Sequence, residues 1–259
     1  LLSIASLAAY GLKLGIDFTG GSILEVEFFT SRPESSQLQN KINTLNLGAV
    51  LIQPTGEKGV LLRLRDLSED EHQRLLGTLS SFGELRELRF DSIGPTIGRE
   101  LRNRSIWATL LVLLMIILYI AWAFRKVSRP VSSWFYGLFA VVALFHDIFI
   151  PLGLFSILGR FQGFEIVTLF VTAILTVLGF SVHDTIVVFD RIRENLKLNI
   201  TNQNFEETVG KSLSQTLVRS INTSLTVIIV LITLYFIGAE STKYFALTLI
   251  VGITAGTYS

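Results

Sequence analysis

The sequence predicts a membrane protein in which six transmembrane α-helices carry one α+β domain outside the cytoplasm, inserted between the first and second helices. Three observations lead to this fold class. Half of the 259 residues are hydrophobic and only 17% are charged, a composition too apolar for a soluble globular chain. Long apolar runs recur along the chain. Most of the remaining polarity is gathered in one block.

The apolar runs predict the membrane helices. Runs close to the ~20 helical residues that cross about 30 Å of hydrocarbon cover residues 105–124, 131–159, 166–189, 221–238 and 244–259. Residues 1–12 are apolar but too short to span. Because the chain begins without Met and ends inside an apolar run, we expect the first and sixth helices to be truncated. Residues 105–259 would then hold helices 2–6, with a cytoplasmic segment around 190–219.

The polar block, residues 13–104, holds 12 of the 22 Lys and Arg residues and 13 of the 21 Asp and Glu residues. This concentration of charge predicts a separate domain that follows the first helix. Apolar side chains in short or alternating runs predict four strands, over residues 22–29, 49–53, 60–65 and 84–92.

Two helices are predicted between these strands. Residues 34–45 follow Arg32-Pro33, and a second helix starts after Ser68, which with Glu71 has the spacing of a capping box. A turn is expected at Pro54-Thr55-Gly56. The resulting order, βαββαβ, is that of the ferredoxin-like fold.

The short loops predict the orientation, since Lys and Arg gather on the cytoplasmic side. The 3–4 and 5–6 loops contribute only Arg160 and Lys243. The 2–3 and 4–5 loops contribute seven cations, Arg125, Lys126, Arg129, Arg191, Arg193, Lys197 and Lys211. The second set is therefore assigned to the cytoplasm, and residues 13–104 to the periplasmic or extracellular side.

Asp184 and Arg219 are the leading candidates for a functional site. A charge at the centre of a membrane helix costs about 2.5–3.5 kcal/mol on insertion scales, so such residues usually face protein or water. Asp184 lies seven residues before Arg191, or about 10 Å along a helix, and Arg219 opens the next antiparallel helix. The two residues form either a proton relay or a structural ion pair.

His183, His146 and Asp147 are further candidates for relay or lining. His183 adjoins Asp184 but points about 100° away around the helix, so it either relays protons or bonds to a neighbouring helix. His146 and Asp147 precede Pro151 in the third helix. Asp147 either bonds backbone groups freed by the proline, pairs with a partner subunit, or belongs to a proton pathway.

Several small and polar residues at a depth similar to that of Asp184 can each be interpreted in two ways. Ser181, Thr185, Asn222, Thr223 and Thr226 either line a pathway or form hydrogen bonds within and between helices. Gly252 and Gly256 have the spacing of a close helix contact, but apolar helices also produce this pattern by chance.

No enzyme is indicated. The chain has no Cys, and its three His residues are scattered over separate segments, so neither thiol chemistry nor a metal site is expected. No Gly-rich phosphate loop with a Lys and no His-Glu-x-x-His motif is present, and no cofactor is expected. The net charge of +1 gives no argument for nucleic acid as a partner.

Two stretches resemble the signatures of one family. GLKLGIDFTGGSILEVEF, residues 11–28, and GFSVHDTIVVFDRIREN, residues 179–195, are similar to those of the SecD/SecF family, the accessory subunits of the Sec protein-export channel. The helix count and the single short outer domain favour SecF, or the SecF half of a fused SecDF chain.

The resemblance implies function and partners. The fold would belong with the resistance-nodulation-division superfamily, in the bacterial inner membrane. The subunit, with SecD, would use the proton-motive force to promote late translocation of polypeptide from the SecYEG channel. SecD, SecYEG, the translocating polypeptide, protons and the lipid bilayer are the implied partners. A proton-coupled exporter of small molecules or lipids and a passive translocon scaffold remain alternatives.

The resemblance also assigns residues. The family's fourth-helix carboxylate falls on Asp184 and its fifth-helix arginine on Arg219, whereas the family more often has Asn at the position of His183. The first signature lies where a helix must become a strand, and glycines there allow torsions closed to other residues. We expect a joint that couples membrane to outer domain, made by Gly15, Asp17, Phe18, Gly20 and Gly21; contact with exported chain is the alternative.

Overall fold

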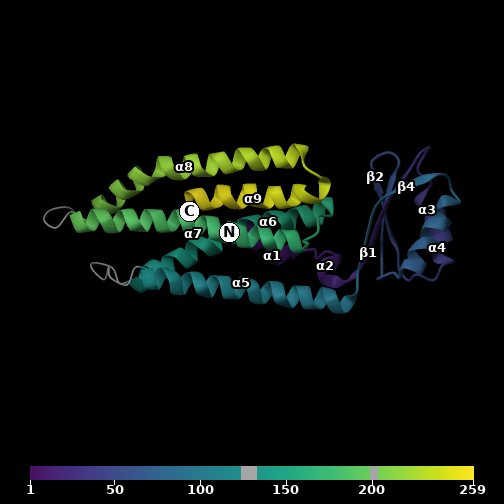
Figure 1. Cartoon of the computed structure of the whole chain (residues 1–259), viewed down its shortest axis with the longest axis horizontal. Coiled ribbons are helices and arrows are strands. Elements are labelled where there is room, and N and C mark those ends of the chain that lie inside the picture. Colours follow the sequence, from purple (N-terminus) through teal and green to yellow (C-terminus); the bar gives the residue numbers. More distant parts are fainter. Residues whose placement is uncertain (124–132, 199–203) are drawn as a thin grey trace. The chain divides into compact units, whose positions relative to one another are not determined.

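The computed structural model describes residues 1–123, 133–198 and 204–259 (Figure 1). The chain divides into two compact units, one made of Leu1–Lys13 with Ser105–Ser259 and the other of Leu14–Arg104. Arg125, Lys126 and Arg129, which entered the orientation argument, lie outside the described residues.

The Leu14–Arg104 unit is an α+β fold whose strands and main helices follow the predicted order. Its four strands form an antiparallel sheet in the order β2-β3-β1-β4. Helices α3 and α4 lie on one side of this sheet (Figure 1). The elements are α2 Ile16–Thr19, β1 Gly21–Phe28, α3 Ser35–Asn43, β2 Leu51–Thr55, β3 Gly59–Leu64, α4 Glu69–Ser80 and β4 Leu85–Ile93.

The core of this unit lies between the sheet and its two helices. Alternate residues of β1 point into it, and Leu24 stands opposite Leu62 of β3 and Phe90 of β4. The side chains that are fully buried there come from both layers: Leu24, Val26, Leu62, Leu38, Ile42, Leu75 and Leu79. Burial of one such side chain stabilises the fold by about 1.5–3 kcal/mol.

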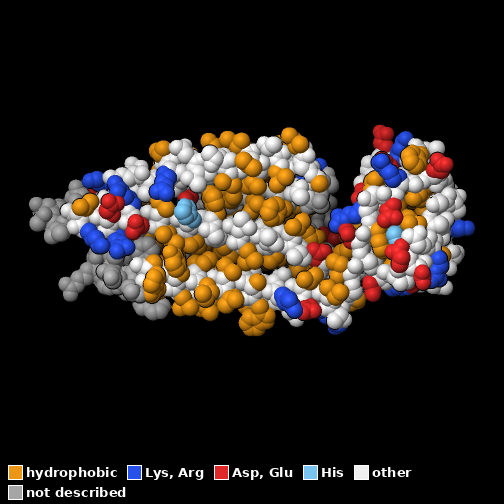
Figure 2. All heavy atoms as spheres, viewed as in Figure 1, with side chains coloured by type: hydrophobic (Ala, Val, Ile, Leu, Met, Phe, Trp, Pro, Cys, Tyr) orange, Lys and Arg blue, Asp and Glu red, His pale blue; other side chains and the backbone are white. Residues whose placement is uncertain are grey.

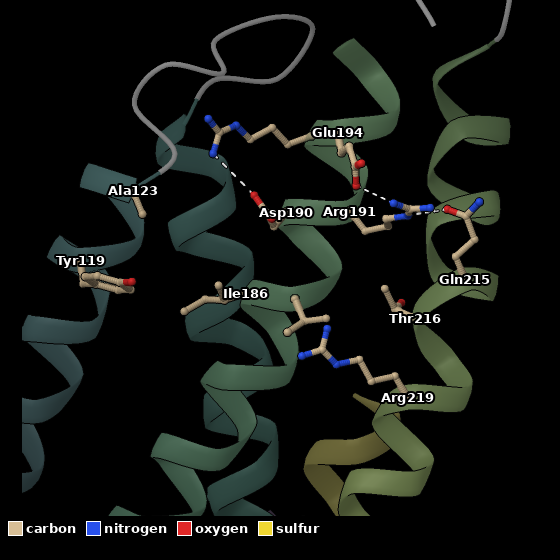
Figure 3. Close-up of a pocket in the computed structure, with 11 residues that line it drawn as sticks. Tyr119, Ala123, Ile186, Asp190, Arg191, Glu194, Gln215, Thr216 and Arg219 are labelled. Carbon is tan, nitrogen blue, oxygen red and sulfur yellow. Dashed lines mark hydrogen bonds and ion pairs between the residues drawn. The ribbon is translucent and has the colours of Figure 1, made fainter. Parts of the chain in front are cut away.

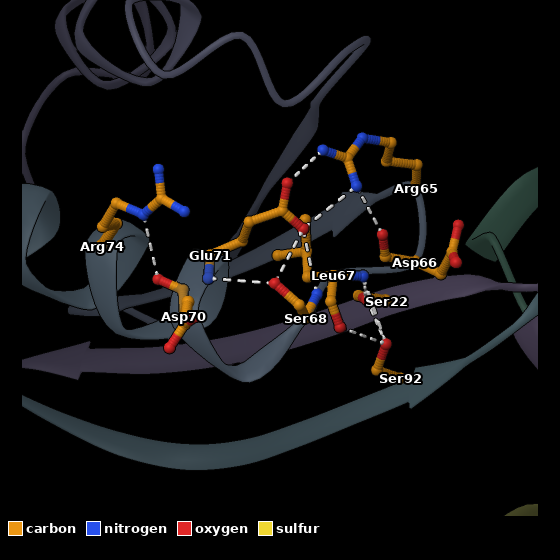
Figure 4. Close-up of polar contacts among 9 residues, drawn as sticks. All are labelled: Ser22, Arg65, Asp66, Leu67, Ser68, Asp70, Glu71, Arg74 and Ser92. Atoms are coloured by element: carbon orange, nitrogen blue, oxygen red, sulfur yellow. Dashed lines mark hydrogen bonds and ion pairs between the residues drawn. The ribbon is translucent and has the colours of Figure 1, made fainter.

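The predicted capping box is confirmed at the start of α4 (Figure 4). The backbone N–H of Glu71 donates to Ser68 Oγ at 3.4 Å, and the backbone N–H of Ser68 donates to Glu71 Oε2 at 3.0 Å. Arg65 Nη1 also donates to Glu71 Oε2 at 3.2 Å. The hydrogen bond and charge of Arg65 lower the pKa of Glu71 to about 2. The carboxylate therefore stays charged where it caps the helix.

One turn predicted from the sequence is wrong, and one helix is longer than its apolar run. The turn expected at Pro54-Thr55-Gly56 is displaced, because β2 continues through Pro54 and Thr55, which pair with Val60 and Gly59. Strand β2 is an edge strand, where a proline removes no ladder hydrogen bond. The helix that carries the apolar run 105–124 begins ten residues before that run, at Pro95, since the first turn of a helix tolerates proline.

The helical unit contains the apolar runs (Figure 2). Among the described residues, four helices are long and apolar enough to cross a membrane: α5, residues Gly137–Gln162 of α6, α7 and α8. Four of the six predicted spans are thus supported. The helices are α1 Leu2–Tyr10, α5 Pro95–Ala123, α6 Ser133–Gln162, α7 Thr168–Leu198, α8 Phe205–Ile237 and α9 Glu240–Tyr258.

Close helix packing in this unit depends on small residues. Helix α9 packs against α6, α7 and α8, and α1 packs against α6. A Cβ on Gly252 of α9 would overlap the side chain of Val177 on α7, and a Cβ on Gly153 of α6 would overlap Ser3 of α1. The Gly252/Gly256 spacing therefore marks a real close contact, one that the sequence pattern by itself did not establish.

Candidate functional site

Asp184 is a buried carboxylate on α7, one of the helices that are long and apolar enough to cross a membrane. Its residue is only 8% exposed, and its Oδ2 is buried without a hydrogen-bond partner among the described residues. Burial of a carboxylate without a hydrogen-bond partner is costly, and ionisable residues kept in membrane helices are usually functional. It is the only carboxylate of the described chain with such an unsatisfied buried oxygen.

Arg219 lies on α8, which packs along α7. Its charge and that of His183 act on Asp184, and the Ser220 hydroxyl lies against the carboxylate. The two charged side chains do not form a direct ion pair, and Arg219 is exposed at the surface of the described chain. The structure thus brings the predicted partners near each other but leaves Asp184 without a clamped counter-ion.

A pocket of about 500 Å³ opens beside Arg219, between α5, α7 and α8 (Figure 3). Figure 3 shows the Arg219 side chain reaching from α8 toward α7. Asp184 does not line this pocket. The lining residues are Tyr119, Ala123, Ile186, Val187, Asp190, Arg191, Arg193, Glu194, Gln215, Thr216 and Arg219.

Asp147 is the centre of a second polar cluster, at the meeting point of three helices. It is fully buried on α6 and accepts hydrogen bonds from Ser181 Oγ of α7 at 2.5 Å and from Ser259 Oγ at 2.9 Å. His146 Nδ1 lies 3.0 Å from its Oδ1. Ser181 stands three residues before Asp184, so Asp147 holds the segment of α7 that carries Asp184.

The neighbours of this cluster leave little free space. A Cβ on Gly256 would come within 3.3 Å of Asp147 Oδ2 and 3.1 Å of the Ser181 Cβ. His146 Nε2 lies 3.4 Å from the Tyr258 hydroxyl. The expectation that Asp147 bonds backbone freed by Pro151 has no support in these contacts, since its partners are side chains. Ser259 and Tyr258 were missed because no local pattern links residues 112 positions apart.

The charge of His183 acts on Asp184, but His183 takes no part in the Asp147 cluster. Its side chain is exposed, and it makes no hydrogen bond within the described part of the chain. Other polar candidates are satisfied inside their own helices: Thr185 Oγ1 donates to the Ser181 carbonyl, Thr223 Oγ1 to the Arg219 carbonyl and Thr226 Oγ1 to the Thr223 carbonyl.

The predicted joint residues form a compact bend. Gly15 precedes the single-turn helix α2, in which Phe18 is only 3% exposed. Gly20 and Gly21 follow with φ of 76° and 127°, torsions that favour glycine. A Cβ on Gly20 would lie 2.7 Å from the Cα of Pro95, the first residue of α5. The bend therefore packs directly on the start of α5.

Metal ligation finds no support in the described ranges, where no group of three His, Asp or Glu residues is placed to hold an ion.

Two family profiles match this chain, and each includes one of the two signature stretches. A family profile described as "Protein export membrane protein SecD/SecF, C-terminal" matches residues 76–259, and one described as "SecD/SecF GG Motif" matches residues 5–28. The second profile includes the bend at residues 15–21, and the first includes Asp147, Asp184 and Arg219.

Individual relatives agree. Protein translocase subunit SecF of Thermobaculum terrenum is 47% identical, over 98% of this chain and 82% of its own. That of Anaerolinea thermophila is 40% identical, over 98% and 82%. The crystal structure of SecDF, a translocon-associated membrane protein from Thermus thermophilus, matches with a TM-score of 0.82 and 33% identity over 99% of this chain, which spans only 34% of that longer chain. The chain therefore belongs to the SecD/SecF family of protein export membrane proteins, among its SecF members.

Proposed function

We propose that this chain is a proton-coupled accessory subunit of the Sec machinery that promotes late polypeptide translocation. One observation carries the proposal: Asp184 is buried in a membrane helix, has an unsatisfied oxygen and lies near a cation that does not clamp it. A carboxylate so placed can gain and lose a proton as its surroundings shift. A merely structural ion pair would be expected to form a direct contact.

We further propose the surroundings of this subunit. Residues 13–104 form a ferredoxin-like domain outside the cytoplasm, six helices span the inner membrane, and the segment around 190–219 faces the cytoplasm. The sheet order β2-β3-β1-β4 and the cations of the short loops support this arrangement. SecD, the SecYEG channel and the translocating polypeptide are its partners, as the family membership favours.

In the proposed cycle, a proton from outside binds Asp184, the attraction of Arg219 for Asp184 falls, and α7 and α8 shift. The bend at residues 15–21 passes this shift to the outer domain. The proton then leaves toward the cytoplasm. A charge crossing 100 mV is worth about 2.3 kcal/mol, whereas moving a two-state equilibrium from 1:99 to 99:1 takes about 5.5 kcal/mol. We therefore propose more than one proton per cycle, or a share of the work for a pH gradient or SecD.

Asp147 has a different role from Asp184 in this proposal. Because Asp147 is held by donors from two other helices, we assign it to positioning α7 and not to carrying protons. His183, exposed beside Asp184, remains a candidate for proton access or for a contact with a partner helix.

The test is Asp184→Asn in membrane vesicles with an imposed proton gradient. The expected result is loss of gradient-dependent export and of gradient-dependent ion conductance, with the complex still assembled. Asp190→Asn is the matched control, since Asp190 lies on the same helix and its side chain is 68% exposed. Arg219→Lys keeps the charge but loses the planar fork, and we expect partial activity.

Unchanged export and conductance in Asp184→Asn would refute the relay. If, in addition, an apolar pair at positions 184 and 219 also supported export, the passive scaffold would be the better description. Gradient-dependent movement of a small molecule or lipid without SecD would favour the exporter.

A further inference from the structure

Besides Arg219, the pocket is lined by charged residues that have no part in the proposed proton relay. Three arginines line it, Arg191, Arg193 and Arg219, together with two carboxylates, Asp190 and Glu194. The described lining therefore carries one net positive charge, from three cations and two anions.

The two carboxylates are occupied by two of the arginines. Arg191 Nη1 lies 2.5 Å from Glu194 Oε2, while its Nε donates to Gln215 Oε1 at 2.7 Å. Arg193 Nη1 lies 3.5 Å from Asp190 Oδ1. Among the described residues, Arg219 forms no ion pair with either carboxylate. Among the charged groups that line the pocket, Arg219 is thus the one without an ion-pair partner there, although its charge also acts on Asp184 outside the pocket.

The acidic groups point outward more than the basic ones. The Asp190 and Glu194 side chains are 68% and 54% exposed, against 30% and 36% for Arg193 and Arg191. Ion pairs as exposed as these contribute little and exchange readily with solvent. The guanidinium groups of Arg191 and Arg193 are thus less hydrated than their carboxylate partners, whereas Arg219 is exposed and open to an anion.

The wall formed by α5 is suited to a hydrocarbon chain. Leu111, Met115 and Tyr119 follow one another at four-residue spacing, on one face of the helix, and are 59%, 57% and 52% exposed. The pocket lies at the Tyr119 end of this apolar stripe. Tyr and Trp at such a position are typical of the membrane interface, and Trp122 stands one turn further along.

We propose that this pocket binds the phosphate group of an anionic phospholipid, with Arg219 as its main ligand, Arg191 and Arg193 beside it, and an acyl chain along the α5 stripe. Planar guanidinium groups match phosphate oxygens in pairs. Basic pockets between membrane helices on the cytoplasmic side bind lipid head groups in this way. The placement on the cytoplasmic side rests on the proposed function, whereas the binding itself does not.

The test measures lipid binding to the full chain in neutral detergent micelles. A fluorescent phosphatidylglycerol is displaced by unlabelled phosphatidylglycerol, by phosphatidylcholine or by inorganic phosphate, and the displacement constants are compared. We expect phosphatidylglycerol to compete at least tenfold better than phosphatidylcholine, and millimolar inorganic phosphate to compete weakly.

Variants locate the site. Arg219→Gln and Arg193→Gln are each expected to weaken phosphatidylglycerol binding about fivefold, the equivalent of about 1 kcal/mol per basic residue near an anionic surface. Arg160→Gln, an exposed arginine in the last turn of α6, is the control and should bind as before. Arg193→Gln keeps the test meaningful if Arg219→Gln fails to fold.

Three results would overturn the proposal: equal competition by the two lipids, an equal loss in Arg160→Gln, or full displacement by inorganic phosphate, which would make the ligand a soluble anion. Asp184→Asn separates this site from the relay. Asp184 does not line the pocket, and its variant removes a negative charge that attracts Arg219, so Asp184→Asn should bind phosphatidylglycerol at least as well as the unsubstituted chain, whatever happens to export.

Discussion

Replacing Asp147 tests whether its carboxylate ties α6 to α7 and α9. The variant Asp147→Ala removes the acceptor for Ser181 at 2.5 Å and for Ser259 at 2.9 Å. Hydrogen bonds between membrane helices contribute about 0.6 kcal/mol on average and up to about 1.7 kcal/mol. Two such bonds predict a loss of about 1–3 kcal/mol in the free energy of unfolding.

The assay is reversible unfolding of the purified chain in mixed micelles, followed by circular dichroism as denaturing detergent is added. Ser181 and Ser259 both donate to the same oxygen of Asp147, Oδ2. Asp147→Asn keeps one acceptor oxygen that can take this position, so it should lose much less than Asp147→Ala. Asp190→Ala, at an exposed site on α7, serves as the control and should change little.

A double-mutant cycle isolates the bond to α7. Ser181→Ala and Asp147→Ala together should lose less than the sum of the single losses, because each single variant already breaks the same hydrogen bond. If the losses add within about 0.3 kcal/mol, Asp147 does not hold α7 through Ser181, and the positioning role assigned to it is wrong.

Three further predictions concern packing, the bend and pH. Gly252→Val should destabilise the α7–α9 contact by about 1–3 kcal/mol, because the added side chain has no room; the same unfolding assay measures it. Gly20→Ala places a Cβ 2.7 Å from Pro95, whereas Gly48→Ala has a similar φ of 81° and open space. Both variants should lose about 1–2 kcal/mol in the free energy of unfolding, because alanine is strained at positive φ, and the Gly20 variant should lose more. Amide hydrogen exchange of the sheet measures both losses, and equal values would contradict the close contact of Gly20 with Pro95. The pKa of Glu71 is lowered from 4.5 to about 2, so its stabilising contribution is complete above pH 4.5 and disappears as the pH falls toward 2. In Glu71→Gln this dependence should flatten, as judged by exchange rates of the α4 amides.

The sequence was sufficient to predict those features that depend only on residues close together in the chain. Ser68 and Glu71 specify the start of α4, and the confirmed capping box depends on nothing further away. By contrast, the turn predicted at Pro54 was wrong, because a proline can lie within a strand when that strand is at the edge of the sheet. The position of β2 at the edge is a property of the pairing with β3, which the segment does not encode alone.

The candidate site shows the same division. Asp184 and Arg219 stand out in the sequence because charges in apolar helices are costly and rare. Their separation without a direct ion pair depends on how α7 and α8 pack, and the pocket beside Arg219 is lined by residues of three helices, α5, α7 and α8.

The sequence by itself determined which segments are apolar enough to cross a membrane, which block folds as an α+β unit and which ionisable residues are costly to bury in apolar helices, since each follows from composition, periodicity and short spacings. Only the tertiary structure decided that Asp147 joins Ser181 and Ser259, 34 and 112 residues away. Hydrogen bonds and van der Waals contacts act over a few ångströms, so partners distant in sequence are chosen by the packing of whole helices.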